Sequence, residues 1–122
     1  MQKESRNTVK IYYPRYNREK LISYLKSKVN ILQREIDLKL MVLFGSYAKN
    51  RFTVASDIDL LIVYGEVSGD AYKIAWDIID IPNLQLFTYS LEEYAKLKNR
   101  TNFIDTVLNE GVIIYRSQDF KI

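Results

Sequence analysis

Two short apolar runs constrain the fold of this chain more than any other feature of its 122 residues. Leu40–Phe44 and Ile58–Tyr64 each have the length of a β-strand and are apolar at nearly every position. A strand with alternating polarity covers a core on one face only, whereas a continuous apolar run needs cover on both faces. We therefore expect both segments to be central strands of a sheet with helices on its two sides.

The segments around these strands alternate between helical and extended patterns. A helix is predicted from Arg18 to about Asp37, because apolar residues recur there every three or four positions. The remaining predicted elements are a helix at Asp70–Ile79, a strand at Leu84–Tyr89, a helix at Leu91–Lys98, a helix around Phe103–Leu108 and a strand at Val112–Tyr115. This order predicts an α/β (α+β) fold with one small mixed β-sheet packed against helices.

Several single residues have predicted local roles. Asn17 is expected to cap the first helix, and Ser90 with Glu93 resembles a capping box. Gly111 is expected to end a helix as a C′ glycine. Trp76 is expected to belong to the core, because it lies in a helix with an apolar face.

Charge is unevenly distributed along the chain and divides it into two predicted regions. Residues 1–40 hold ten Lys/Arg and four Asp/Glu, a net +6, whereas residues 41–122 hold eight and eleven, a net −3. We interpret residues 1–17 as a basic, tyrosine-rich N-terminal arm and residues 18–122 as a single domain. The arm either binds an anionic partner such as nucleic acid, or packs its tyrosines on the body or on a second copy of the chain.

The chain has no cysteine and no histidine. This composition excludes thiolate and imidazole chemistry, so any catalysis depends on carboxylates, hydroxyls, Lys, Arg or backbone dipoles. Any metal would be one that prefers oxygen ligands, such as Mg²⁺ or Mn²⁺. No apolar run approaches the length of a membrane span, and the N-terminus lacks the apolar stretch of a signal peptide. We therefore expect a cytoplasmic protein without a membrane partner.

The strongest candidate site lies between the two apolar runs. Asp57 and Asp59 open the second run, and side chains two residues apart in a strand project to the same face, about 7 Å apart. Two adjacent carboxylates repel each other unless a cation lies between them, and a divalent metal removes this conflict. Magnesium also binds phosphates, so this pair suggests a metal-dependent triphosphate site.

Gly45 and Ser46 follow the first run and supply the other half of this site. Glycine allows the backbone to approach a phosphate closely, and a helix starting after it would direct free amides at the anion. The Ser46 hydroxyl can donate a further hydrogen bond. Lys49, Arg51 and Ser56 lie in the same connection and are additional candidate nucleotide-binding residues.

Gly-Ser, a gap of ten residues and Asp-x-Asp resemble the signature of the polymerase-β-type nucleotidyltransferase superfamily. The short chain is similar to its minimal nucleotidyltransferase branch, which is often paired with HEPN-domain toxins. The resemblance implies transfer of a nucleoside monophosphate, commonly AMP from ATP, to an acceptor hydroxyl with two metal ions. It implies that Gly45 and Ser46 hold the triphosphate and that Asp57 and Asp59 ligate the metals.

The sequence departs from that family at one catalytic position. A third carboxylate normally comes from the following strand, and Gln85 occupies the expected position. An amide oxygen is a weak metal ligand and cannot accept a proton as a base. Asp80 is a substitute candidate for the third carboxylate, although its position before Pro82 indicates that it ends a helix instead.

Two functions from different classes follow. The first is a metal-dependent enzyme that transfers AMP to a partner protein, such as a HEPN-type helical protein, in an antitoxin-type role, or to an RNA end. The second is a catalytically weak or inactive antitoxin that works by complex formation, which Gln85 favours. Nucleic-acid binding through the basic arm is a third, less supported hypothesis.

Overall fold

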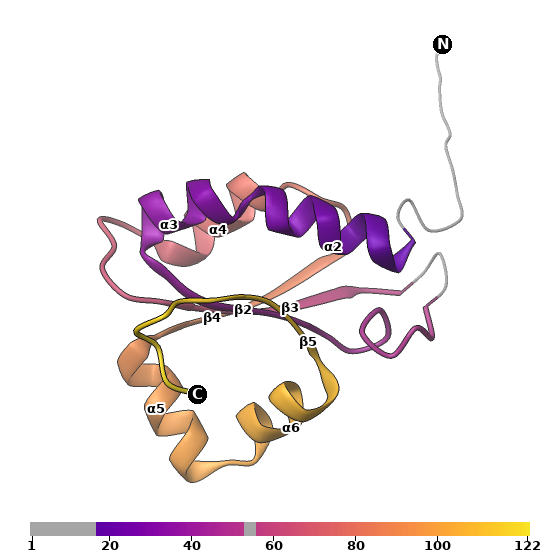
Figure 1. The fold of residues 1–122 in the computed structure, drawn as a ribbon. Coiled ribbons are helices and arrows are strands. Elements are labelled where there is room, and N and C mark those ends of the chain that lie inside the picture. The colour runs from indigo at the N-terminus through magenta and orange to yellow at the C-terminus, as the bar shows by residue number, and fades with distance from the viewer. Residues whose placement is uncertain (1–16, 53–55) are drawn as a thin grey trace.

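The computed structural model describes residues 17–52 and 56–122, so the predicted arm, apart from Asn17, lies outside the described residues. The described chain forms one mixed sheet between two layers of helices (Figure 1). Its elements in chain order are α2 (Arg18–Ser27), α3 (Val29–Ile36), β2 (Leu38–Phe44), β3 (Ile58–Tyr64), α4 (Ala71–Ile79), β4 (Leu84–Ser90), α5 (Leu91–Arg100), α6 (Phe103–Glu110) and β5 (Val112–Arg116).

The order of the described strands is β4-β3-β2-β5, so β2 and β3 are the central strands, as the apolar runs predict. β2 is antiparallel to β3 and to β5, whereas β3 and β4 are parallel. Helices α2, α3 and α4 cover one face of the sheet, and α5 and α6 cover the other (Figure 1). The predicted fold class, a small mixed sheet packed against helices, is confirmed.

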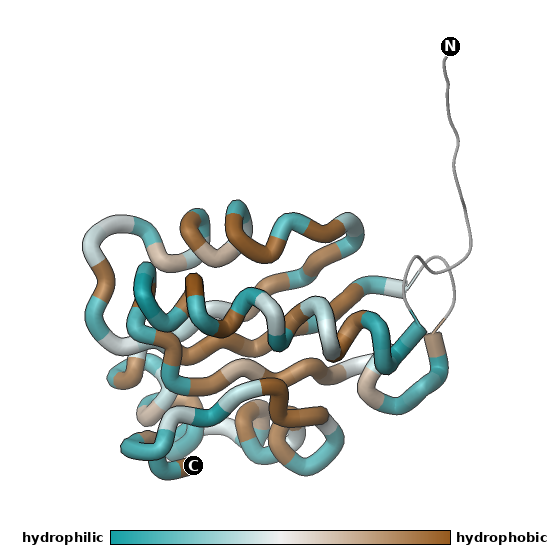
Figure 2. Tube along the Cα trace, turned by 45° about the horizontal axis from the view of Figure 1, so that its top comes forward, coloured by the Kyte–Doolittle hydropathy of each residue, from teal (hydrophilic) through white to brown (hydrophobic). Residues whose placement is uncertain are grey.

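Both faces of the central strands are buried. Leu43 and Leu60 belong to the core under α2, α3 and α4, whereas Val42 and Leu61 belong to the core above α5 and α6. All four side chains are fully buried. Figure 2 shows that apolar segments follow the strands while polar segments follow the outer turns. Cover on both faces explains why these strands need continuous apolar runs.

The prediction of one continuous helix from Arg18 to Asp37 is wrong, because α2 and α3 meet at Lys28. The Lys28 amide donates to the Leu25 carbonyl, three residues back, at 3.1 Å, which is the tighter bond of a 3₁₀ turn. The interruption leaves the predicted apolar stripe facing the sheet. Its fully buried members are Leu21, Leu25, Leu32 and Ile36.

Trp76 corrects a second expectation, because its side chain is 41% exposed and outside the core. The buried face of α4 consists of Ala71, Ala75 and Ile79, at intervals of four residues. Trp76 follows Ala75 directly, so it is rotated by about 100° from that face. It stacks on Tyr72, with ring centroids 6.0 Å apart, at the surface of α4.

The predicted caps are confirmed, with one difference at Gly111. The Asn17 side chain accepts from the Lys20 amide, and Ser90 and Glu93 form the predicted capping box. Gly111 ends α6 in an extended conformation, with φ −90°, and not in the left-handed conformation typical of a C′ glycine. Glycine is required there by packing, since an added Cβ would lie 2.6 Å from the Val107 carbonyl oxygen.

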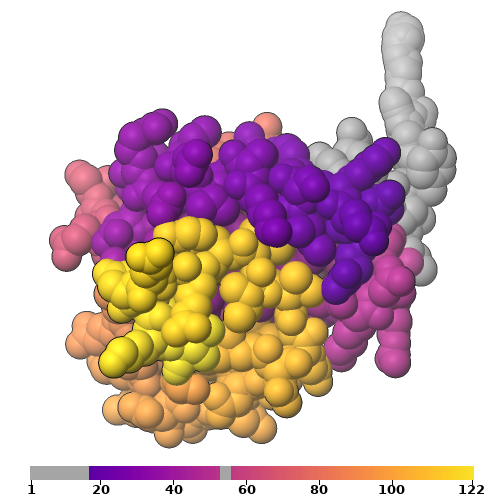
Figure 3. Space-filling model, in the orientation of Figure 1, coloured from indigo at the N-terminus to yellow at the C-terminus, as the bar shows by residue number. Residues whose placement is uncertain are grey.

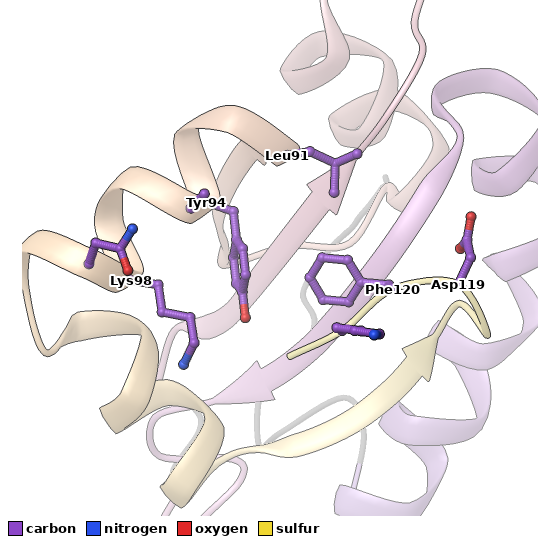
Figure 4. A pocket seen from close by; sticks show the side chains of 8 residues that line it. Leu91, Tyr94, Lys98, Asp119 and Phe120 are labelled. Carbon is purple, nitrogen blue, oxygen red and sulfur yellow. The ribbon is translucent and has the colours of Figure 1, made fainter.

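The residues after β5 return to the α5 side of the sheet. Phe120 packs edge-on against Tyr94 of α5, with ring centroids 5.1 Å apart (Figure 4). A hollow of about 450 Å³ opens between α5 and this C-terminal segment, and none of the predicted site residues lines it. No helix in the described part of the chain is long and apolar enough to cross a membrane.

Candidate functional site

The candidate site lies at the end of the sheet where β2 ends and β3 and β4 begin. The strand register places Phe44 of β2 opposite Asp59 of β3, and Asp59 opposite Gln85 of β4. Directly paired residues in a sheet project to the same face. Asp59 and Gln85 are therefore neighbours on the face that α5 and α6 cover. The structure thus brings together two predicted site residues that are 26 positions apart in the sequence.

Asp59 has an unusual environment for a carboxylate. Its side chain is half-buried, and its Oδ1 atom is buried without a hydrogen-bond partner among the described residues. Burial raises the pKa of Asp59, and the nearby charge of Asp57 raises it further. Because two carboxylates meet here with an oxygen unsatisfied, the pair fits a divalent cation that prefers oxygen ligands.

Gly45 lies directly against this carboxylate. Its φ of +77° is in the left-handed region that favours glycine. A Cβ at this position would clash with Oδ2 of Asp59 and lie 3.2 Å from its Cγ. The glycine predicted to approach a phosphate therefore also leaves the space that the Asp59 carboxylate occupies.

The described part of the connection after Gly45 is a series of turns and contains no α-helix, so any amides that face an anion there belong to turns. The Lys49 amide donates to the Gly45 carbonyl at 3.2 Å, and the Arg51 amide donates to the Ser46 carbonyl at 2.9 Å. The rings of Tyr47 and Phe52 stack 4.2 Å apart and anchor the turns to the core under α2. Within the described residues no hydrogen bond uses the Ser46 amide, which leaves it available to an anion.

The remaining predicted nucleotide-binding residues are in different environments. Lys49 forms an ion pair with Glu110 of α6, with 3.0 Å between Nζ and Oε1. Arg51 is exposed, and Ser56 is half-buried just before Asp57. Their roles toward a nucleotide stay predictions. No motif in the sequence indicates that Glu110 contacts this site, and only its position at a helix end could be predicted.

A third carboxylate does not complete this pair. Among the described residues, no group of three acidic side chains is placed to hold a metal ion. Asp80 is the C-cap of α4, with φ 49° and its amide bonded to the Trp76 carbonyl, so it ends that helix as expected. Gln85 occupies the position where the third carboxylate is expected. It is exposed and pairs with Asp59 in the strand register.

The sequence is similar to that of known proteins along most of its length. Residues 19–120 match the family model described as Polymerase beta, Nucleotidyltransferase. A Methanocaldococcus jannaschii protein named as a candidate protein adenylyltransferase, MJ0604, is 36% identical over 109 residues, which cover 81% of this chain and 99% of that protein.

A solved structure shares the fold at low sequence identity. A candidate nucleotidyltransferase from Sulfolobus solfataricus aligns with a TM-score of 0.56 and 16% identity, over 87% of this chain and 89% of its own. A toxin-antitoxin structure with AMP-PNP aligns over 76% of this chain and 74% of its own, with a TM-score of 0.48 and 19% identity. The family model spans the described fold from α2 to the segment after β5.

Proposed function

Because the chain belongs to the polymerase β-type nucleotidyltransferase family, we propose that it transfers AMP from ATP to a hydroxyl group with Mg²⁺ or Mn²⁺. The observation that carries this proposal is the Asp59 carboxylate, which lies against Gly45 with one oxygen unsatisfied. A buried polar atom without a partner costs about 1–3 kcal/mol, and a cation bound at Asp59 would supply the missing partner. The charge of Asp57 acts on Asp59 and raises its pKa, which supports a cation shared by the two carboxylates.

Each residue of the site has a role in this reaction. Asp57 and Asp59 hold the divalent cation, which when bound would neutralise phosphate charge. Ser46 and its free amide bind the triphosphate, and Lys49, Arg51 and Ser56 lie in or next to the same turns as further contacts. Gln85 orients the attacking hydroxyl by hydrogen bonding, but an amide cannot take its proton.

The transfer itself exchanges one phosphorus–oxygen bond for another. The acceptor oxygen bonds to the α-phosphorus of ATP while the bond from that phosphorus to the bridging oxygen breaks. Pyrophosphate leaves, and the hydroxyl proton passes to solvent or to a released phosphate oxygen. With no carboxylate at position 85, we expect slow turnover, because a positioned general base contributes roughly 10²–10⁴ in rate.

The proposed acceptor is a hydroxyl on a partner protein. Support comes from the relative named as a protein adenylyltransferase, which aligns over nearly its full length. A HEPN-type helical toxin, neutralised in the cytoplasm by this antitoxin-type reaction, is the partner that the branch resemblance suggests. An RNA end is the alternative acceptor.

The proposal is tested by incubating the protein with α-labelled ATP, magnesium and the protein encoded by the neighbouring gene. Label should pass to the partner with the wild type and should not pass with Asp59→Asn. Asp37→Asn is a matched control, because Asp37 is also a carboxylate beside a glycine but lies at the other end of the sheet. Equal labelling by wild type and Asp59→Asn would contradict the proposal.

Gln85 supports a second candidate function, an antitoxin that acts by complex formation without turnover. In that case Asp59→Asn would neutralise the partner as well as the wild type does, with no label transferred by either protein. If Asp59→Asn loses neutralisation while it still binds the partner, complex formation alone is not sufficient and the enzyme is favoured.

A further inference from the structure

Glu110 contacts the proposed triphosphate site from an element that the sequence motif does not include. It is the last residue of α6, and its Oε1 lies 3.0 Å from Nζ of Lys49. Both side chains are partly exposed, at 43% for Lys49 and 49% for Glu110. In Figure 3 the surface at the α6–β5 junction lies beside the turns that follow β2. The pair therefore joins α6 to the turns that begin at Gly45.

The position of Glu110 is unfavourable for its own helix. The C-terminal end of a helix carries partial negative charge and favours cations, and the last turn of α6 contains no basic residue. A carboxylate there is stabilised from outside the helix, and Lys49 supplies the positive charge. Helix stability alone does not explain why an acidic residue occupies this end.

Glu110 is also held in place by the residue that follows it. A Cβ on Gly111 would lie 2.6 Å from Cγ1 of Val42 and 2.9 Å from the Leu43 carbonyl oxygen. This packing fixes the end of α6 against the last residues of β2, just before Gly45. The Glu110 backbone therefore has little freedom to move away from the triphosphate turns, whereas the long Lys49 side chain can change partners.

We propose that Glu110 competes with the triphosphate of the nucleotide for Lys49 and thereby lowers the affinity of the site for ATP. The proposal rests on the proposed function, because it requires a triphosphate at the turns after Gly45. When Lys49 turns to a phosphate, Glu110 is left as an unpaired negative charge beside an anionic ligand. Its role is to position Lys49 and to weaken binding, and it takes no part in the chemical step.

The size of the effect follows from the exposure of the pair. Exposed ion pairs contribute about 0.2–1 kcal/mol, which corresponds to a factor of roughly 1.4–5 in an equilibrium constant. We therefore expect Glu110→Gln to bind Mg·ATP about 1.4- to 5-fold more tightly than the wild type. Added salt should reduce this difference, because screening weakens the competing pair in the wild type.

The experiment measures the dissociation constant of Mg·ATP by titration calorimetry for a set of matched variants. Glu110→Asp should keep part of the competition, and Asp77→Asn should match the wild type. Asp77 is the control because it forms an exposed pair with Lys73 at 3.1 Å on α4, outside the proposed site. In turnover assays Glu110→Gln should lower KM for ATP and leave kcat unchanged, which a loss of folding stability would not produce.

The decisive comparison uses a Lys49→Met background. There Glu110→Gln should tighten binding less than it does in the presence of Lys49, because the competing pair no longer exists. The proposal is overturned if Glu110→Gln binds Mg·ATP no more tightly than the wild type does. It is also overturned if Glu110→Gln gains the same affinity for Mg·ATP with and without Lys49. If the wild type itself binds no Mg·ATP, the proposed function fails, and the role of Glu110 fails with it.

Discussion

The two ends of the β2–β3 pair repeat one arrangement with opposite outcomes. At one end, the missing Cβ of Gly45 makes room for Oδ2 of Asp59, and at the other end Gly65 makes room for Oδ2 of Asp37. Asp37 Oδ2 accepts from the Glu66 amide at 3.0 Å, and Asp37 Oδ1 lies 3.4 Å from Nζ of Lys39. Asp59 has no such partner for its buried Oδ1 among the described residues.

This difference separates a structural carboxylate from a candidate ligand-binding one. At the Asp37 end, Lys39 also pairs with Asp119 at 3.2 Å, and Ser117 donates to Asp119, so each carboxylate there has a partner. At the Asp59 end the neighbouring charge that raises the pKa of Asp59 is another carboxylate, Asp57. The same geometry therefore stabilises the fold where its partners are present, and where they are missing it supports the proposed binding site.

The largest expected effect is on catalysis by Asp59→Asn. We expect it to lower AMP transfer by about 10²–10³-fold or more, because a preorganised electrostatic partner of the reacting groups is lost. Asp37→Asn should keep its turnover number and lower the free energy of unfolding instead, since it loses a charged partner of Lys39. Radiolabel transfer and urea unfolding of both variants measure the contrast, and a loss of activity in both would remove the distinction between the ends.

A carboxylate added beside Asp59 should raise the rate of AMP transfer, whereas Asp59→Asn lowers it. Gln85→Asp places a group that can accept a proton next to Asp59 in the strand register, and we expect transfer to rise by roughly 10²-fold. The initial rate of pyrophosphate release measures the gain. An unchanged rate, with Mg·ATP still bound, would show that position 85 does not assist the attacking hydroxyl.

Alanine at the two glycines should separate function from stability. Gly45→Ala forces a side chain into a left-handed backbone position and displaces Asp59, so we expect a loss of about 10²-fold in transfer. Gly65→Ala meets Asp37 instead, and we expect it to lower the free energy of unfolding by about 1–3 kcal/mol without changing kcat. Equal effects of both variants on kcat would contradict the contrast.

Tyr94 provides a reference for an unpaired buried atom that has no proposed ligand. Its side chain is 4% exposed, burial raises its pKa, and its hydroxyl has no hydrogen-bond partner among the described residues. Tyr94→Phe removes the unsatisfied hydroxyl, so we expect the free energy of unfolding to stay equal or to rise by about 1 kcal/mol. Chemical denaturation measures it, and a clear loss of stability would mean that the hydroxyl has a partner in solution.

The smallest effect concerns the compensated end at low pH. Hydrogen bonding from Ser117 and then the pairing with Lys39 lower the pKa of Asp119 below its ordinary 3.8. A lowered pKa stabilises the fold above the unfolded-state value and is lost as the pH falls through the folded-state value. The wild type should therefore be more stable than Asp119→Asn near neutral pH, and the two stabilities should converge below about pH 3.8. Parallel pH profiles would contradict this linkage.

Much of this arrangement could be predicted from the sequence because it depends on local rules. The predicted strand at Ile58–Tyr64 has the bounds of β3, whereas the shared face of Asp57 and Asp59 stays a prediction, because Asp57 precedes that strand. The capping residues and the ending role of Asp80 follow from side-chain chemistry within a few positions. The place of Gln85 near Asp59 is implied by the family resemblance and not by a local rule, and it depends on the register of β3 and β4.

The rest depends on contacts between distant segments. The exposure of Trp76 follows from which face of α4 meets the sheet, and small alanines occupy that face. The pairing of Lys49 with Glu110 joins positions 61 residues apart, and no periodicity indicates it. The packing at Gly111 and the clash-free space at Gly45 likewise exist only once β2 lies beside its neighbours.

The central claim is that Asp59 holds the metal ion of a bound Mg·ATP. Its most direct test is thermal or chemical unfolding with and without Mg·ATP. A ligand that binds only the folded state adds about 2.7 kcal/mol at a concentration one hundred times its dissociation constant. We predict such a gain for the wild type and for Asp37→Asn, and little or none for Asp59→Asn at the same concentration. An equal gain in Asp59→Asn and in the wild type would show that the nucleotide binds without this carboxylate and would contradict the proposed site.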